Sequence, residues 1–480
     1  MAQLTAVRAL QHGLVAQNAG KLAEAERFYR AILNAQPAEP ANDDQRSLIA
    51  QTYSYLGIVY RDKGDLKAYI DCFRQATRVK PNNVDTLNNL GAALQYNGEL
   101  DAAVDIFNLA LKIDDQCVEI YNNMGSSLQG RGDSDAAIAC FKKAIEIKPD
   151  YENAYNNLGH ALHTKGDLEG AIDCYRSALK ISPDSAQAHN NLGNVLRDVG
   201  KYEEAIEHFD FITALAVNPS TAQFWFNSKS QALECLYILG RYDELMERLN
   251  VLAKSGEINL REAAVSAFVT NQLKLKDPYP FCKKPMDFFH EGNLNNYISD
   301  VDSFADELIK EAANVAQVWE PQHGVTKSGF QTSPTIFQAG KNTEALEKII
   351  RKEIEAYYSK FKLEDCAYMN QWPREYFLRG WFVRLVKNGY QEPHNHPSGW
   401  LSGVVYLKTV DDADNDEGAI ELGLHGHDLP ILHENYARIV HRPKKGDIIL
   451  FPSSVFHRTI PFHEDTDRCV MAFDLYRYSQ

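Results

Sequence analysis

Residues 84–116 read VDTLNNLGAALQYNGELDAAVDIFNLALKIDDQ, and this stretch decides the fold of the first half of the chain. Apolar residues recur at intervals of three and four on both sides of Gly98, which predicts two amphipathic helices joined by a turn. The pattern returns every 34 residues, and two series of glycines mark the period: Gly57, Gly91, Gly125, Gly159 and Gly193, and Gly64, Gly98, Gly132, Gly166 and Gly200. Such a period predicts helical hairpins that stack into a superhelix with a concave groove.

The two glycines of each unit have different expected roles. The earlier one, such as Gly91, lets the first helix approach the second closely, and the later one, such as Gly98, supplies the turn. By its period and by the pattern G-(x)6-G-(x)4-A-(x)3-F/Y, the array resembles the tetratricopeptide repeat. Divergent copies precede and follow the regular units. The sequence therefore predicts a tetratricopeptide-repeat domain over residues 1–260, and the resemblance implies a protein or peptide partner.

Asparagine recurs in pairs in the first helix of four units, although it is a mediocre helix former. The second member of each pair stands where the repeats of O-linked N-acetylglucosamine transferase carry an asparagine ladder that grips peptide backbone. That resemblance implies peptide contacts for Asn89, Asn123, Asn157 and Asn191. A side-chain amide offers a donor and an acceptor, so it matches a peptide unit without reading its sequence. Hydrogen bonds between neighbouring repeats are the equally weighted alternative.

The 34-residue register ends after residue 260, and a connection is expected over 261–290, in which the prolines of DPYPFCKKP (residues 277–285) indicate a non-helical stretch. Helical spacing persists in residues 301–318 and 342–361. From about residue 375, short β-branched and aromatic runs alternate with turn residues, which is typical of an all-β sandwich or a closed jelly roll. The predicted fold class is therefore multidomain α + β, with a β domain and supporting helices over residues 291–480.

Composition limits the possible partners and compartments. The chain has 480 residues, with 50 Lys and Arg against 65 Asp and Glu, and its net charge of −15 argues against a nucleic-acid partner. It has no apolar window long enough for a membrane span, and its start does not read as a signal peptide. A soluble, cytoplasmic protein with no membrane partner is expected. The eight cysteines form no CxxC pair and are expected to be reduced.

Histidine is concentrated in the predicted β domain, where eight of the 15 lie between residues 394 and 463. Residues i and i+2 share one face of a strand, so His394 and His396 can point into one cavity as half of a metal site. His457, which follows the run GDIILFPSSVF, is the candidate third ligand. Four other histidines are not predicted to be ligands: His425, His427, His433 and His441.

Four runs in this region carry a resemblance: HNHPSGWLSGVVYLK, GAIEL, PKKGDIILFPSSVFHRTIP and DRCVMAF. They resemble the iron(II)/2-oxoglutarate-dependent dioxygenases, specifically a prolyl-hydroxylase-like family with HxHP, SGVYYL and FPSxxxH signatures. The resemblance covers about residues 280–480. It implies a double-stranded β-helix, or jelly roll, that holds Fe(II) and the cosubstrate 2-oxoglutarate.

The metal ligands follow from this resemblance with one departure. His394 and His457 match the two histidines of the superfamily, but His396 stands where most members have Asp or Glu. Three neutral ligands leave the site one negative charge short, which should weaken the binding of a dication. A neutral His396 is the preferred third ligand. The alternatives are an open position or an oxygen from one of three carboxylates: Glu392, Glu417 and Glu421.

The cosubstrate needs a cation for its distal carboxylate, and the fork of an arginine binds both oxygens at once. Arg468 lies 11 residues after His457 and agrees with the carboxylate-binding residue of the superfamily. Tyr406 matches a tyrosine that prolyl-hydroxylase-like members use for the same carboxylate. Arg384 is a second candidate for charge pairing, and Trp381 and Trp400 are candidates for the substrate pocket.

The resemblance implies an oxygenase that converts dioxygen and 2-oxoglutarate to carbon dioxide and succinate while a C–H bond of the substrate is hydroxylated. The substrate would be a protein or peptide recruited by the repeats, by analogy with collagen prolyl hydroxylases. Two alternatives remain open. One is a cupin-like metal domain that uses no 2-oxoacid, and the other is a tetratricopeptide scaffold whose β domain is not catalytic.

Overall fold

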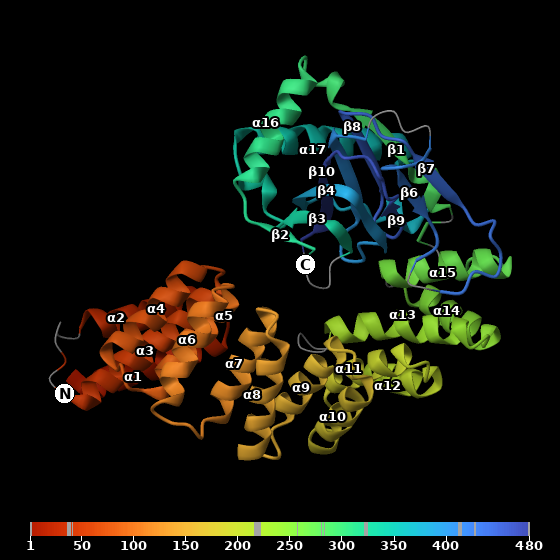
Figure 1. The fold of residues 1–480 in the computed structure, drawn as a ribbon. Helices are drawn as coiled ribbons and strands as arrows, with labels where there is room; N and C mark the ends of the chain where they lie inside the picture. The colour runs from red at the N-terminus through yellow and green to blue at the C-terminus, as the bar shows by residue number, and fades with distance from the viewer. Residues whose placement is uncertain are drawn as a thin grey trace. The chain divides into compact units, whose positions relative to one another are not determined.

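The structure is a computed structural model of the chain (Figure 1). It describes all residues except 1, 36–39, 41, 216–221, 257, 280, 283, 321–324, 411–414, 427–428 and 479–480, and the side chains of 2–5, 222, 223 and 226 are also left out. His427 therefore lies outside the described residues. The chain divides into two compact units, Met1–Ile212 and Thr213–Gln480.

The first unit is built of helical hairpins, as the 34-residue period predicts (Figure 1). Each helix packs against its neighbours in sequence, and the first helices of successive hairpins also contact one another. The hairpins therefore form a continuous stack. Their helices are α1 (Ala2–Asn18), α2 (Leu22–Asn34), α3 (Asp43–Asp62), α4 (Leu66–Val79), α5 (Val84–Tyr96), α6 (Leu100–Leu111), α7 (Val118–Gly130), α8 (Ser134–Ile147), α9 (Glu152–Thr164), α10 (Leu168–Ile181), α11 (Ala186–Asp198) and α12 (Tyr202–Ala214).

The glycines have the roles expected from the sequence. A Cβ added to Gly125 on α7 would lie 2.6 Å from Cε1 of Phe141 on α8, a distance that real side chains do not allow. Gly132, in the turn between these helices, has φ of 90°, a backbone conformation that side-chain-bearing residues resist. Close approach and turn geometry thus fix the two glycine positions of the repeat.

The close approach at Gly125 can be tested with Gly125→Ala. In an unhindered helix this change would stabilise the protein, because Ala is the better helix former. Here it should lower the free energy of unfolding by about 1–3 kcal/mol, because the methyl group overpacks the interface with Phe141. Thermal unfolding followed by circular dichroism measures the change. The control is Gly130→Ala on the same helix, where the nearest atom is the tip of Leu100, and a similar loss there would contradict the explanation.

The second unit contains further helices and a β domain (Figure 1). The helices of this unit are α13 (Ala222–Ile238), α14 (Tyr242–Ser255), α15 (Leu260–Leu273), α16 (Val301–Ala313), α17 (Lys341–Phe361) and α18 (Ala367–Asn370), with short 3-10 turns η1 (Pro285–Phe288), η2 (Leu294–Asn296) and η3 (Ile336–Gln338). The strands are β1 (His290–Asn293), β2 (Gln317–Trp319), β3 (Thr326–Thr332), β4 (Tyr376–His394), β5 (Leu401–Lys408), β6 (Ile420–Gly423), β7 (Arg438–His441), β8 (Asp447–Pro452), β9 (Phe456–Thr459) and β10 (Arg468–Arg477).

The strands form one curled antiparallel sheet in the order β1-β8-β5-β10-β4-β9-β6-β7, and the β2–β3 hairpin joins it along β4 (Figure 1). Side chains alternate between two cores. On β10, Met471 and Phe473 pack in the core that includes α16 and α17, whereas Val470 packs in the inner core of the sheet with Val383 and Tyr406. By this alternation Arg468 and Asp474 share the inner face with Val470.

The first compact unit ends at Ile212, whereas the repeat pattern in the sequence predicts a repeat domain up to residue 260. The difference arises because α13 and α15 are tied to the loop between β6 and β7. The hydroxyl of Tyr237 on α13 donates a hydrogen bond to the carbonyl of Pro430 (2.8 Å). The side chain of Gln272 on α15 donates to the carbonyl of His433 (3.0 Å) and accepts from the amide of Leu432 (2.7 Å). Helix α15 occupies the start of the expected 261–290 connection and ends before the proline-rich stretch 277–285.

The cysteines and the apolar character of the helices can be compared with the predictions made from composition. All eight cysteines are free thiols. In the described part of the chain, no helix is both long enough and apolar enough to cross a membrane.

Candidate metal and cosubstrate site

The candidate metal site is built by the pairing of β4 with β9. In this antiparallel pair His394 lies directly opposite His457. The register shifts between Gln391 and His394, and such an irregularity re-aims the side chains at the end of a strand. Alternation along a strand predicts that His394 and His396 both lie on β4. In the structure β4 ends at His394, and His396 lies just beyond it. It is held there by a hydrogen bond from its amide to the carbonyl of Ser453 (3.0 Å).

The three predicted ligands come together. One ring nitrogen from each of His394, His396 and His457 lies within 4.8 Å of the other two. Among the described residues, these histidines form the group that could hold a metal ion. The ring centroids are 4.2 Å apart for His394 and His457, 5.1 Å for His394 and His396, and 5.0 Å for His396 and His457. Three imidazoles on one side of an ion suit a transition metal with open positions on the other side.

Each imidazole is oriented through its Nδ1 atom. Nδ1 of His394 contacts the carbonyl of Glu392 at 2.7 Å, and Nδ1 of His457 contacts that of Val455 at 3.5 Å. Nδ1 of His396 instead contacts both oxygens of Asp474, at 2.7 and 2.8 Å. Nδ1 atoms engaged in this way leave the Nε2 atoms for an ion. Burial, and then the neighbouring His394 and His396, holds the pKa of His457 well below its usual range, which favours the neutral ligand form.

Sequence reasoning missed Asp474. The signal was present, because Asp474 is an acid inside the apolar strand RCVMAFDLY and has the same parity as Arg468. The three carboxylates considered as alternative ligands lie elsewhere. Glu421 pairs with Arg458 across the strands, Glu417 contacts His463, and neither these two nor Glu392 belongs to the histidine group.

Arg468 and Tyr406 lie close together inside the β domain. Arg468 is 2% exposed, and its guanidinium carbon lies 5.1 Å from the ring centroid of Tyr406. The Nε atom donates to the carbonyl of Gly418 (3.0 Å), but Nη1 of Arg468 and the hydroxyl of Tyr406 have no hydrogen-bond partner among the described residues. Burial raises the pKa of Tyr406 to about 12 and lowers the pKa of Arg468, an effect that Tyr406 opposes.

Two buried donors without a partner fit an anionic ligand, because buried polar groups are normally hydrogen-bonded. The strands connect this pair to the histidines. Gly418 lies close before β6 in the chain, and Leu422 on β6 pairs with His457. A small anion such as a carboxylate therefore suits the Arg468–Tyr406 pair, and a metal ion suits the histidine group.

The remaining candidates lie in different environments. Arg384 is partly exposed and pairs with Asp467 (3.0 Å), so it does not serve the inner face. The ring of Trp381 lies 5.4 Å from that of His396, close enough to border the metal site. Trp400 is buried in the core shared with α17 and stacks near Tyr368.

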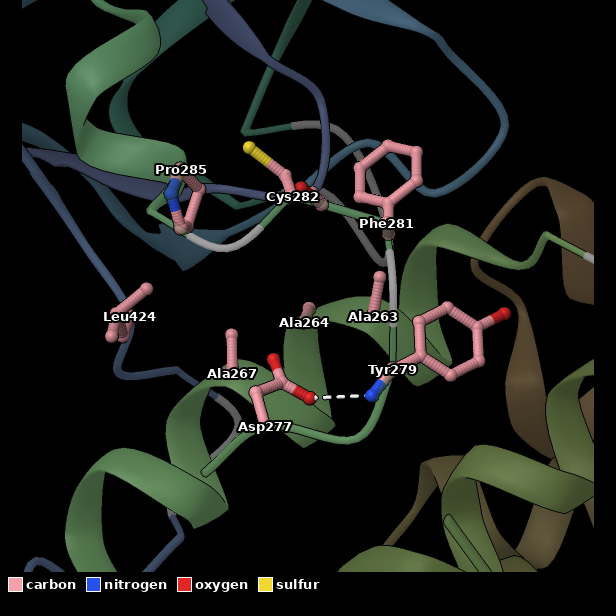
Figure 2. Close-up of a pocket in the computed structure, with 10 residues that line it drawn as sticks. Ala263, Ala264, Ala267, Asp277, Tyr279, Phe281, Cys282, Pro285 and Leu424 are labelled. Atoms are coloured by element: carbon pink, nitrogen blue, oxygen red, sulfur yellow. Dashed lines mark hydrogen bonds between the residues drawn. The ribbon is translucent and has the colours of Figure 1, made fainter. Parts of the chain in front are cut away.

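Two cavities in the described part of the second unit are lined by residues other than the three histidines. Figure 2 shows one between α15 and the β domain, where the carboxylate of Asp277 accepts a hydrogen bond from the amide of Tyr279. Its 10 Å³ would hold about one water molecule. A cavity of 490 Å³ lies between α16 and the outer face of the sheet, where Phe382, Leu407 and Cys469 line it.

The asparagines of the repeats make hydrogen bonds between neighbouring hairpins at two steps. Nδ2 of Asn123 donates to Oδ1 of Asn88 (3.0 Å), and Nδ2 of Asn157 donates to Oδ1 of Asn122 (2.8 Å). At the next step Oδ1 of Asn156 has no hydrogen-bond partner among the described residues, so the bond from Asn191 is not made there. The two steps match the inter-repeat alternative, and peptide binding by Asn89, Asn123, Asn157 and Asn191 stays a prediction.

These contacts predict two classes of asparagine. Asn123→Ala should lower the free energy of unfolding by about 0.5–1.5 kcal/mol, the usual net value of one hydrogen bond. Asn191→Ala, which removes no such bond, should leave thermal stability nearly unchanged. Calorimetry measures the thermal stability of both variants. Equal losses of stability in Asn123→Ala and Asn191→Ala would contradict the assignment of an inter-repeat hydrogen bond to Asn123 and not to Asn191.

Comparison with family models divides the chain in the same way as its sequence patterns. Residues 379–474 match the model described as "Putative 2OG-Fe(II) oxygenase". Tetratricopeptide-repeat models match residues 57–98, 84–113, 130–166, 159–198 and 188–218. The chain thus joins tetratricopeptide repeats to an oxygenase-type segment. The oxygenase match contains all three histidines, Tyr406, Arg468 and Asp474.

Among solved structures, the chain is similar to MamA, with 28% identity, a TM-score of 0.30, and coverage of 32% of this chain and 91% of that one. It is also similar to pilF of Pseudomonas aeruginosa, with 18% identity, a TM-score of 0.38, and coverage of 45% and 96%. A third is a thermophilic tetratricopeptide-repeat protein of Thermus thermophilus, with 17% identity, a TM-score of 0.35, and coverage of 38% and 99%. No curated protein matches the chain.

Proposed function

We propose that this protein is an Fe(II)- and 2-oxoglutarate-dependent dioxygenase that hydroxylates a protein or peptide recruited by its repeats. The observation that carries the proposal is the convergence of His394, His396 and His457 in the same β domain as a buried Arg468–Tyr406 pair with unfilled hydrogen-bonding capacity. The match of residues 379–474 to an oxygenase model supports the same class.

The residues have distinct roles in this proposal. The histidines hold the metal through neutral imidazoles, and Arg468 with Tyr406 holds the distal carboxylate of 2-oxoglutarate. When bound, the iron and the 2-oxoacid supply the oxidising chemistry. The apolar inner core around Val470 and Val383 keeps bulk water away from the carboxylate and strengthens its attraction to Arg468. A cytoplasmic location and recruitment by the repeat groove belong to the proposal as well.

A non-catalytic scaffold is the second candidate, because none of the three ligands is a carboxylate. Binding of metal and 2-oxoglutarate separates the two. Anaerobic titration of the protein with Fe(II) and 2-oxoglutarate should produce the weak visible absorption band of a chelated 2-oxoacid. His457→Ala should abolish this band, because the remaining two imidazoles provide an incomplete site. No band with the unaltered protein, or an unchanged band with the variant, would reject the oxygenase.

The carboxylate end of the site gives an independent prediction. Arg468→Ala should raise the KM for 2-oxoglutarate by at least about tenfold, because it removes the buried cation that pairs with the carboxylate. Turnover of 2-oxoglutarate to succinate measures it. Arg384→Ala is the matched control, since that arginine is partly exposed and pairs with Asp467, and it should leave the KM unchanged. An equal effect of both variants would refute the assignment of Arg468.

A further inference from the structure

Asp474 has an unusual environment for a carboxylate. It lies on β10, it is 1% exposed, and one of its hydrogen-bond partners is the candidate ligand His396. His396 contacts both of its oxygens, the hydroxyl of Ser402 donates to Oδ1 at 2.7 Å, and the hydroxyl of Tyr476 donates to Oδ2 at 3.2 Å. Ser402 is itself fixed by Ser453, at 2.8 Å between the hydroxyl oxygens.

No lysine or arginine among the described residues forms an ion pair with Asp474, and His396 is its basic partner. A buried carboxylate is costly unless a positive charge compensates it. The basic side chain in direct contact with Asp474 is His396, on the side where the three imidazoles converge, so positive charge bound there would compensate the carboxylate. A divalent ion at that point would supply it.

The three imidazoles also differ in what holds them. His394 and His457 are oriented by backbone carbonyls, which are neutral, and only His396 contacts a carboxylate. His396 is also the residue that stands where the superfamily has Asp or Glu. His396, the candidate ligand at the position where a carboxylate was expected, is thus the imidazole whose Nδ1 atom contacts the carboxylate of Asp474.

We propose that Asp474 is a positioning residue that supplies this missing charge through His396. By accepting the Nδ1 proton, Asp474 fixes the tautomer with Nε2 free and makes this imidazole a more basic ligand. The His396–Asp474 pair then takes the place of the single carboxylate ligand. The inference rests on the proposed metal site and concerns the affinity of that site.

The test measures the affinity of the full chain for Co(II) alone, by its visible spectrum under anaerobic conditions. Asp474→Asn keeps the shape and an acceptor but removes the charge, and it should weaken Co(II) binding by about 10- to 100-fold. The control is Tyr476→Phe, which removes one hydrogen bond to the same carboxylate and keeps its charge, and which should change the affinity little.

A rescue separates charge from a structural role. Combining His396→Asp with Asp474→Asn places the carboxylate directly in the ligand position and returns one negative charge to the site. This double variant should bind Co(II) more tightly than Asp474→Asn alone. If Asp474→Asn does not fold, NMR of the Zn(II)-loaded unaltered protein provides a second readout, in which the His396 proton should be found on Nδ1.

The possible failures are distinct. If the unaltered protein binds neither Co(II) nor Fe(II), the proposed metal site itself fails. If it binds Co(II) but Asp474→Asn binds equally well, or the double variant shows no recovery, the role of Asp474 is overturned and the metal site stands. A proton on Nε2 of His396 would also overturn it.

Discussion

The candidate site depends on the register between β4 and β9. Because the strands are antiparallel and His394 is paired with His457, two residues far apart in sequence present their rings to one point. A slip of one residue would turn one of these rings to the other face of the sheet, since side chains alternate along a strand. The same sheet brings in β10, which places Arg468 and Asp474 on its inner face, so the sheet pairing positions both ends of the site.

Much of this was accessible from the sequence, for identifiable reasons. The 34-residue period is a local signal, and the conformations of Gly125 and Gly132 follow from sterics within one hairpin. The histidine group could be predicted because eight of the 15 histidines lie between residues 394 and 463, two of them as HxH, whereas Arg468 was predicted from the resemblance. The double core of the sheet likewise follows from alternation along β10.

Other features depend on contacts that spacing does not encode. Asp474 was missed because a single acid in a strand does not show what it faces, and its partner His396 is 78 residues away. The asparagine pairs fit two roles from sequence alone, since only the hydrogen bonds from Asn123 and Asn157 to the preceding repeat distinguish them. The repeat pattern extends past Ile212 because α13 and α14 also pack as a pair, whereas the hydrogen bonds from Tyr237 and Gln272 that join these helices to the β domain leave no periodic signal.

Gln272 on α15 shows how these helices support the β domain. It is 1% exposed, and its side-chain amide makes three hydrogen bonds to the backbone of Leu432 and His433. These bonds satisfy backbone groups of the loop that none of the described strands pairs with. A shortened chain that starts at the first strand of the β domain would lose these bonds. The loop between β6 and β7 would then expose backbone groups that α13 and α15 now satisfy.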